Sequence, residues 1–298
     1  MNKKSQISAY VLFGIVILLL LIIIYFQFFG VPYRGKEDYV EEPKSFSGNV
    51  AVIPIKGQIV SDRIFPDEYV AASSDIAALI EKADKDSSIK IIVLEINSDG
   101  GSGFAALEIA NALKQTSKTK VAWIRESGAS AAYFLASYAD HIIADKISYV
   151  GSIGVILDYE IQNVSHEVVK AGRYKDIFNQ YRPLTEEERK ILQQDIDYQH
   201  QIFIEEVAKN RKMQKNEVEK IANGLSYNGI QAKELGLIDE IGGKAEVLNY
   251  IKQKQDIEPV FAYYNSATGL FDLEEPSQSS CSTNQQPHPN NPIPLKTP

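Results

Sequence analysis

Apolar residues follow two spacings through the middle of the chain. Continuous or alternating apolar runs at 49–59, 89–96 and 120–124 predict strands, and the β-branched run IKIIVLEI is typical of a strand buried on both faces. Between these runs, apolar residues recur every three or four positions at 76–83 and 106–113, which predicts helices. The later run HIIA predicts one more strand. Strands that alternate with helices indicate a mainly parallel sheet, so the predicted fold class is α/β.

Two loops of small residues follow consecutive predicted strands. The loop SDGGSG begins at Ser98, and the loop ESGAS ends at Ser130, where an apolar, helix-forming run begins. Loops after the carboxyl ends of parallel strands lie at one edge of the sheet, where sites of α/β proteins are built. We therefore expect the two loops to meet at that edge.

Capping signals mark the starts of several predicted helices. Ser74 is the expected cap of the first helix, and Thr185 with Glu188 forms a capping box that opens a helix of about seven turns. Shorter helices are predicted within NEVEKIANG, which Gly224 ends, and within YNGIQAKELG. The second half of the chain is therefore expected to be mainly helical.

The N-terminal region has the pattern of a membrane anchor. From Ala9 to Phe26, eighteen residues run without a charge. This length spans a hydrocarbon core of about 30 Å, and no small-residue cleavage site follows, so an anchor is favoured over a signal peptide. The predicted organisation is a short flank at 1–6, a transmembrane anchor at 7–29, a linker at 30–47, a folded domain at 48–265 and a disordered tail rich in Ser, Gln, Asn and Pro at 266–298.

The charges that flank the anchor give a weak signal for its orientation. Lys3 and Lys4 precede it, and Arg34 and Lys36 follow it. The positive-inside rule hardly separates these two sides. The short N-terminal flank favours a cytoplasmic N-terminus, which would place the folded domain on the extracytoplasmic side of the cell membrane.

Composition excludes some classes of function. The net charge of −8 and the pI near 5.2 argue against a nucleic-acid-binding protein, which normally has a basic face. The single cysteine, Cys281, lies in the predicted tail, so no disulfide can form within one chain. No Cys/His cluster has the spacing of metal ligands, and no metal is expected.

The small residues around Ser130 allow two interpretations: a helix that packs closely, or a nucleophile on a strand-to-helix turn that a substrate must approach. A nucleophilic serine needs a base, which is most often histidine. No histidine falls in a loop at the expected sheet edge, so a Ser-His-Asp triad is disfavoured and a lysine base is the alternative. The four histidines are His141 at the start of a strand, His166 and His200 on expected helices, and His288 in the tail.

The glycines of the first loop also allow two interpretations. Consecutive N–H groups at Asp99 to Gly101 can point into one concavity and bind the oxyanion of a tetrahedral intermediate. The other interpretation is a tight turn, because glycine readily takes positive φ.

Six blocks of sequence together resemble the signal peptide peptidase A family. In order they are SDGGSGFAALEIANAL, ESGASAAYFLASYADHIIA, VGSIGV, KAGRYKDI, LTEEER and GLSYNGIQAKELGLIDEIGG. The resemblance covers about 48–265 and implies a membrane-anchored serine protease on the crotonase/Clp protease fold, with peptide substrates such as released signal peptides. It implies no cofactor, and it implies a homo-oligomeric ring.

The resemblance also implies roles for single residues. Ser130 matches the nucleophile, Lys175 in YKDI matches the general base, and Ser152 in GSIGV matches the serine that orients the lysine. Gly101 matches the glycine of the oxyanion hole, and the N–H of Ala131 is the expected second donor. On their own, Lys175 fits a solvated surface lysine and Ser152 a turn residue.

The chain departs from the family pattern in two places. Ala131 and Ala132 replace a glycine pair after the nucleophile, and Asp99 replaces a proline in the glycine loop. A methyl group there could restrict the approach of a substrate, and a carboxylate would disfavour an anion. Three alternatives stay open: a stomatin-cleaving membrane protease, an acyl-CoA enzyme of the crotonase type and a non-catalytic membrane scaffold.

Overall fold

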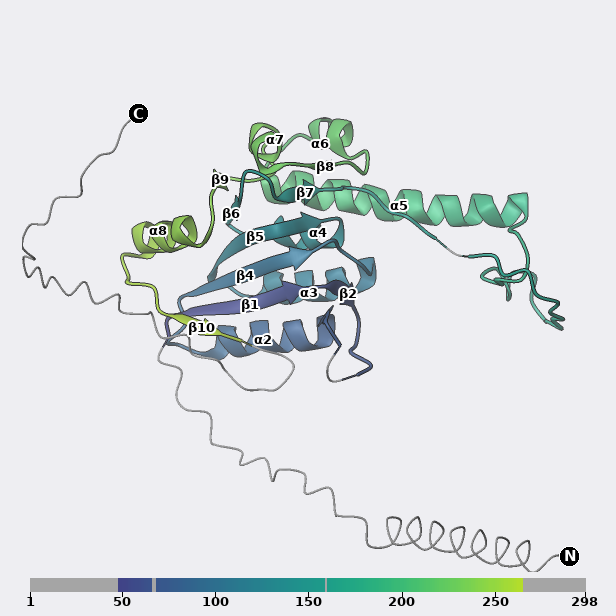
Figure 1. Ribbon diagram of the computed structural model, residues 1–298, viewed down its shortest axis with the longest axis horizontal. Coiled ribbons are helices and arrows are strands. Elements are labelled where there is room, and N and C mark those ends of the chain that lie inside the picture. Colours follow the sequence, from purple (N-terminus) through teal and green to yellow (C-terminus); the bar gives the residue numbers. More distant parts are fainter. Residues whose placement is uncertain (1–47, 66–67, 159, 265–298) are drawn as a thin grey trace, which may run out of the picture. The chain divides into compact units, whose positions relative to one another are not determined.

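The computed structural model describes residues 48–65, 68–158 and 160–264 (Figure 1). The predicted flank, anchor and linker (1–47) and the predicted tail (266–298) lie outside the described residues. Within the described ranges, no helix is both long enough and apolar enough to span a membrane.

The centre of the domain is a mainly parallel sheet, which confirms the predicted α/β class. Six strands pair in parallel, and β7 continues the sheet beside the carboxyl end of β5, with the short β8 antiparallel to it. In spatial order the strands are β10 (Phe261–Tyr263), β1 (Val50–Lys56), β4 (Ile91–Ser98), β5 (Thr119–Ala129), β6 (His141–Ala144) and β9 (Glu240–Ile241), with β7 (Tyr149–Gly151) and β8 (Ser226–Tyr227) to the side.

Helices cover both faces of the sheet. α2 (Ser73–Lys85), α3 (Gly103–Gln115) and α4 (Ala131–Ala136) lie behind it in Figure 1. α8 (Lys244–Gln255) packs on the other face. Side chains alternate between the two faces of a strand, so β-branched residues at every position are buried on one side or the other. The cluster under α8 comprises Val50, Val52, Ile91, Val93, Val121, Ile143, Val247 and Ile251, all fully buried.

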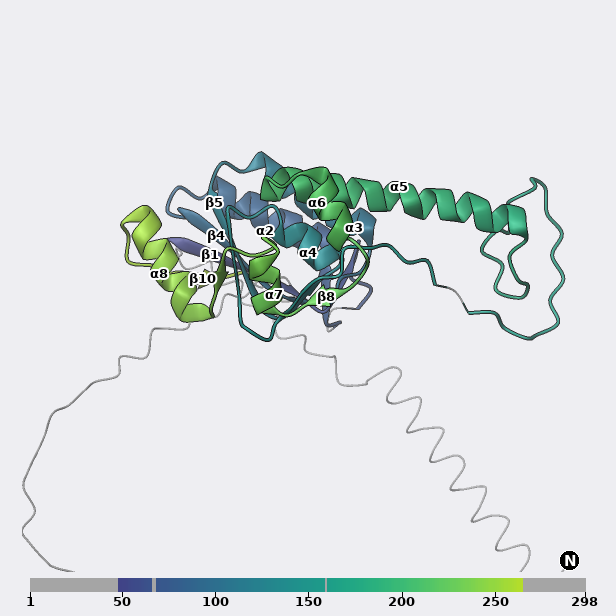
Figure 2. The same cartoon turned by 90° about the horizontal axis from the view of Figure 1, so that it is seen from above.

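The long helix α5 (Glu186–Arg211) starts at the predicted capping box. The Thr185 hydroxyl accepts the Glu188 N–H at 3.2 Å, and the Glu188 carboxylate accepts the Thr185 N–H at 2.9 Å. In both ribbon views α6 (Lys215–Ile221) lies beside the C-terminal end of α5 (Figures 1 and 2). α7 (Gly229–Glu234) follows β8.

The structure corrects two predictions near the start of the domain. The run at 49–59 is split at Gly57, which has a φ of 74°, into β1 and β2 (Gln58–Val60), and β2 pairs with β3 (Val70–Ala72) in a separate sheet. Ser74 is not a cap: the N-cap of α2 is Ala72, and no side chain caps this helix. The Ser73 hydroxyl instead bonds the Glu108 carboxylate.

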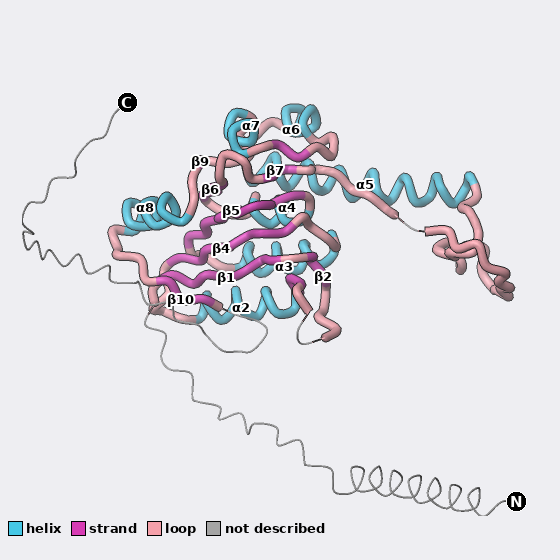
Figure 3. The backbone as a smooth tube through the Cα atoms, in the orientation of Figure 1, coloured by secondary structure: helices cyan, strands magenta, loops and turns pink. Residues whose placement is uncertain are grey.

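A long connection joins β7 to α5. Residues 155–184, here called the arm, contain no helix or strand among those described (Figure 3). His166 was expected on a helix but lies in the arm. In both ribbon views the arm leaves β7, runs alongside α5 and then forms a loop at the N-terminal end of that helix, while Val155 and Ile156 at its start line the same pocket as Ser130.

Candidate active site

Ser130 occupies the turn between β5 and α4 in a backbone conformation that is rare for serine. Its φ is 52° and its ψ −127°, a combination that costs on the order of 1–3 kcal/mol. Its N–H donates to the Gly151 carbonyl at 2.8 Å, and its carbonyl accepts the Phe134 N–H at 2.9 Å. The Ser130 hydroxyl makes no hydrogen bond to a described residue. This strained strand-to-helix turn has the mechanics of a nucleophile elbow.

The glycine loop passes directly against Ser130. Gly100 has a φ of 108°, and a Cβ there would lie 2.8 Å from the Ser130 Cβ and 3.0 Å from the Ala131 nitrogen. The other side of the loop is fixed by β2, since the Ile59 N–H donates to the Gly100 carbonyl at 2.9 Å and the Ile59 carbonyl accepts the Ser102 N–H at 2.9 Å. Gly101 also takes positive φ, and a Cβ there would meet the Ile59 oxygen at 2.2 Å. The loop is therefore built on two residues that have to be glycine.

Two backbone N–H groups near Ser130 have no acceptor among the described residues. The N–H of Gly101 is not used in the pairing with Ile59, and Ala131 is the first residue of α4, where N–H groups lack intrahelical acceptors. Both residues line the same groove as Ser130. Their arrangement is suited to an anion that forms beside the Ser130 hydroxyl.

Four of the five predicted site residues line one groove. It has a volume of about 970 Å3 and includes Gly101, Ser130, Ala131 and Ser152. Its walls come from α3, α4 and α5 and are largely apolar. Wall residues include Phe104, Leu107, Phe134, Ile196 and Phe203.

The groove also holds residues that the sequence did not single out. His200, on α5, lines it, and its Nε2 is buried without a partner among the described residues. Among the described residues, no hydrogen bond joins this ring to Ser130. Asp197, on the same helix, also lines the groove. Both line the groove because they lie on the same side of α5. Helical spacing in the sequence predicts that they share one side of a helix, but not that this side lies at the groove.

Ser152 lies in the groove with positive φ, 50°. Its N–H donates to the Leu225 carbonyl at 2.9 Å, and its hydroxyl donates to the Gly224 carbonyl at 3.1 Å. The predicted hydrogen bond to Lys175 is not formed within the described chain.

Lys175 is not brought to Ser130 within this chain. It lies exposed in the arm, in a smaller cavity of about 370 Å3 that it shares with His166, Asp176 and Tyr181. Lys175 is not among the residues that line the groove of Ser130. The structure therefore assembles the serine, the two N–H donors and Ser152, and it leaves the lysine apart.

The two departures from the family pattern have different surroundings. Ala131 lines the groove but is only 6 % exposed, and Ala132 is fully buried, so the two methyl groups present little surface to a substrate. Asp99 is exposed and lines the groove beside Gly101. The alanines are compatible with the oxyanion site, whereas Asp99 adds a charge at its rim.

Comparison with known proteins identifies the family. The model of peptidase family S49 matches residues 112–258. A Methanocaldococcus jannaschii protein named as a protease is 36 % identical over 224 residues, 71 % of this chain and 72 % of that one. The chain belongs to peptidase family S49. This membership confirms the resemblance to the signal peptide peptidase A family and places the chain among the serine peptidases.

Two bacterial S49 relatives are also similar to this chain. Protease 4 of Haemophilus influenzae is 32 % identical over 255 residues, 76 % of this chain and 41 % of its own length. A protein of Enterococcus faecium named as a signal peptide peptidase is 32 % identical over 203 residues, 64 % of this chain and 59 % of its own length. The chain thus spans less than two thirds of the length of each of these two bacterial relatives.

Proposed function

We propose that this S49 peptidase is a membrane-anchored serine endopeptidase that uses Ser130 as nucleophile and Lys175 as general base. The observation that carries the proposal is the strained Ser130 beside two N–H groups without acceptors in one groove. The predicted anchor supports action at the bilayer surface, with the folded domain on the extracytoplasmic side. The mainly parallel sheet with helices on both faces is compatible with the crotonase/Clp protease fold.

In the proposed reaction, the Ser130 Oγ attacks the carbonyl carbon of the scissile peptide bond while the neutral amine of Lys175 takes its proton. The N–H groups of Gly101 and Ala131 stabilise the oxyanion of the tetrahedral intermediate. The lysine then gives the proton to the leaving amine, and the acyl-enzyme forms. Water, deprotonated by the same amine, releases the acid and restores Ser130. In this scheme the Ser152 hydroxyl holds the lysine toward Ser130.

Because Lys175 lies apart from Ser130 in one chain, we propose that a second copy of the chain supplies it. The arm exposes large apolar side chains, with Ile156 at 88 % and Val169 at 95 %. Such surface is typical of an interface. Docking of each arm on its neighbour would build a homo-oligomeric ring in which every site is shared.

The proposed substrates are peptides, in particular released signal peptides and other membrane-associated remnants. The apolar wall of the groove supports apolar segments as ligands. One of the relatives is named as a signal peptide peptidase, which points the same way.

Digestion of casein and of a synthetic signal peptide by the full-length protein in detergent tests the proposal. Wild type should digest both, and Ser130→Ala should digest neither. Equal digestion by the two proteins would refute a serine nucleophile at this position. Labelling by a fluorophosphonate adds a second test, since an acyl-CoA enzyme or a scaffold should leave Ser130 unmodified.

A further inference from the structure

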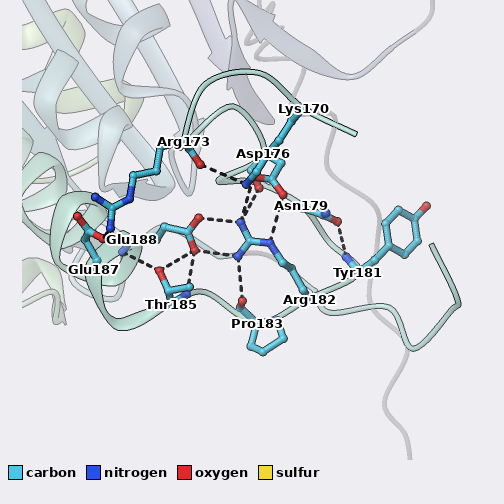
Figure 4. Close-up of polar contacts among 10 residues, drawn as sticks. All are labelled: Lys170, Arg173, Asp176, Asn179, Tyr181, Arg182, Pro183, Thr185, Glu187 and Glu188. Atoms are coloured by element: carbon cyan, nitrogen blue, oxygen red, sulfur yellow. Dashed lines mark hydrogen bonds and ion pairs between the residues drawn. The ribbon is translucent and has the colours of Figure 1, made fainter. Parts of the chain in front are cut away.

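The two residues that flank Lys175 are both tied to the first turn of α5. The Tyr174 hydroxyl bonds the Glu187 carboxylate. On the other side, the Asp176 carboxylate is held by Arg182, which also binds the neighbouring carboxylate of α5, Glu188 (Figure 4). The turn that carries Lys175 is thus fastened at both ends to one helical turn.

Arg182 is the central residue of the hydrogen-bond network that joins the Lys175 turn to α5. Its Nη1 and Nη2 donate to the two Glu188 oxygens at 2.8 and 2.7 Å, a bidentate pair. Its Nε donates to the Asp176 carboxylate at 3.3 Å, and its Nη2 donates to the Asp176 backbone carbonyl at 3.2 Å. The Glu188 side chain is 4 % exposed and that of Asp176 13 %, so neither pair is an ordinary surface ion pair.

The carboxylates of this network are charged throughout the neutral range. Arg182 and the Thr185 N–H lower the pKa of Glu188 to about 2. Hydrogen bonds from Lys170 and Arg182 hold the pKa of Asp176 well below its usual range. Any of these carboxylates could therefore attract a free ammonium group.

Each carboxylate of this network is nevertheless engaged by another cation. Lys170 and Arg182 pair with Asp176, Arg182 pairs with Glu188, and Arg173 pairs with Glu187. The Lys175 amine itself makes no hydrogen bond or ion pair with a described residue. All three carboxylates thus have other partners, and Lys175 has none among the described residues.

An unpaired lysine is what a general base requires. A carboxylate beside an ammonium group stabilises the protonated form and so reduces the fraction of neutral amine at a given pH. We propose that Arg182 is a positioning residue that holds the Lys175 turn and keeps the neighbouring carboxylates from pairing with the Lys175 amine. This inference rests on the proposed role of Lys175 as base.

A pH test of this proposal has to take account of the other charged and titratable groups around Lys175. Groups that titrate or carry charge around it come from its own turn, from the wall of its cavity and from α5. His166 stacks on Tyr181 with 4.1 Å between ring centroids. The charged and titratable groups around Lys175 are Lys170, Arg173, Tyr174 and Asp176 on its turn, His166 and Tyr181 in the cavity, and Arg182, Glu187 and Glu188 at α5.

The experiment compares Arg182→Ala with Arg189→Ala in the full-length protein by recording kcat/KM from pH 7.5 to 10.5. Arg189 is an exposed arginine beside Glu188 with no side-chain bond to the network, so it is a matched control. We expect Arg182→Ala to lose about tenfold or more in kcat/KM at pH 8. The midpoint of the increase of kcat/KM with pH should move upward by about one pH unit. Arg189→Ala should match wild type in both values.

A second variant separates positioning from folding. Arg182→Ala combined with Asp176→Asn removes the carboxylate next to Lys175 that loses Arg182 in the single variant. The midpoint should therefore return toward that of wild type, and kcat/KM at pH 8 should recover in part. Loss of folding or assembly would lower the amount of enzyme, seen by circular dichroism and gel filtration, without moving the midpoint. If Arg182→Ala is too inactive for a pH profile, partial recovery in the double variant supports the proposal and no recovery overturns it.

Lys175→Ala, measured in parallel, distinguishes this inference from the proposed function. An inactive Lys175→Ala beside an Arg182→Ala with wild-type kcat/KM and midpoint overturns the role of Arg182 and leaves the base intact. An active Lys175→Ala overturns the base itself.

Discussion

At the scale of single residues, close approach explains the composition around Ser130. The serine keeps its strained backbone because β5, β7 and the glycine loop hold it from three sides, with its N–H on the Gly151 carbonyl at 2.8 Å. Every residue of α4 behind it is buried. The first interpretation of the small residues is therefore confirmed, since α4 packs closely, and the same packing leaves Ser130 at the groove, as the second interpretation requires.

Gly100→Ala tests this close approach. The new Cβ would lie 2.8 Å from the Ser130 Cβ at a φ of 108°, so the serine or the loop has to move. A displacement of this kind is expected to lower kcat/KM about a hundredfold. Gly243→Ala is the control, because no atom lies within 4 Å of its added Cβ and its φ is negative. Wild-type kcat/KM in Gly100→Ala would show that the contact does not position Ser130.

Lys175→Arg tests the chemistry of the base. Arginine keeps the charge and the length but stays protonated at any pH that proteins tolerate. The variant should lose about a hundredfold to ten-thousandfold in kcat/KM, the usual contribution of a general base. Lys190→Arg, an exposed lysine on α5, should change nothing. In wild type, activity should rise with pH into the alkaline range.

Ser152→Ala tests whether the Ser152 hydroxyl holds Lys175 toward Ser130, a hydrogen bond that the described residues of one chain do not form. The Ser152 hydroxyl donates to the Gly224 carbonyl at 3.1 Å, and the same hydroxyl would turn to the lysine in an assembled site. Loss of orientation should lower kcat about a hundredfold with little change in thermal stability. An unchanged kcat would return Ser152 to the role of a turn residue.

At the scale of elements, two local signals predicted their elements correctly, whereas the expected cap at Ser74 was wrong. The capping box at Thr185 and Glu188 starts α5, and the run HIIA is β6. The sequence missed the last five residues of β5, RESGA, because they lack apolar alternation. They form a strand because they pair with neighbouring strands: Gly128 lies opposite Ser98 of β4 on one side and opposite Val150 of β7 on the other. The arm is not helical at His166, since no core packs against it in one chain.

The start of α5 also carries a pH dependence. The pKa of Glu188 is lowered to about 2 by Arg182 and Thr185. A lowered folded-state pKa means that the charged form stabilises the fold above the usual value near 4.5, and this stabilisation is lost as pH falls toward 2. Glu188→Gln should therefore have a lower Tm than wild type at pH 7. The difference in Tm should shrink between pH 4.5 and pH 2, and a constant difference would contradict the assignment.

At the scale of the whole molecule, the described residues of one chain do not assemble the proposed Ser–Lys dyad. The groove contains Ser130, Ser152 and the two proposed oxyanion donors, Gly101 and Ala131. Lys175 lies in the arm, which exposes large apolar side chains. A heterologous contact that repeats around a ring would give each groove the arm of a neighbour. This arrangement follows from the separation of Ser130 and Lys175 together with the proposed dyad, and it predicts complementation between inactive copies.

Mixed assemblies of Ser130→Ala and Lys175→Ala test that prediction. Each variant should be inactive alone. Co-expressed with different affinity tags and purified through both, they should regain activity, because some boundaries pair an intact serine with an intact lysine. In a random equal mixture about a quarter of the boundaries qualify, since the two neighbours at each boundary are independent. Mixing Ser130→Ala with a Ser130→Ala/Lys175→Ala double variant is the control, because no boundary then has a serine. If demonstrably mixed assemblies show no activity above the single variants, the dyad does not lie across a subunit boundary.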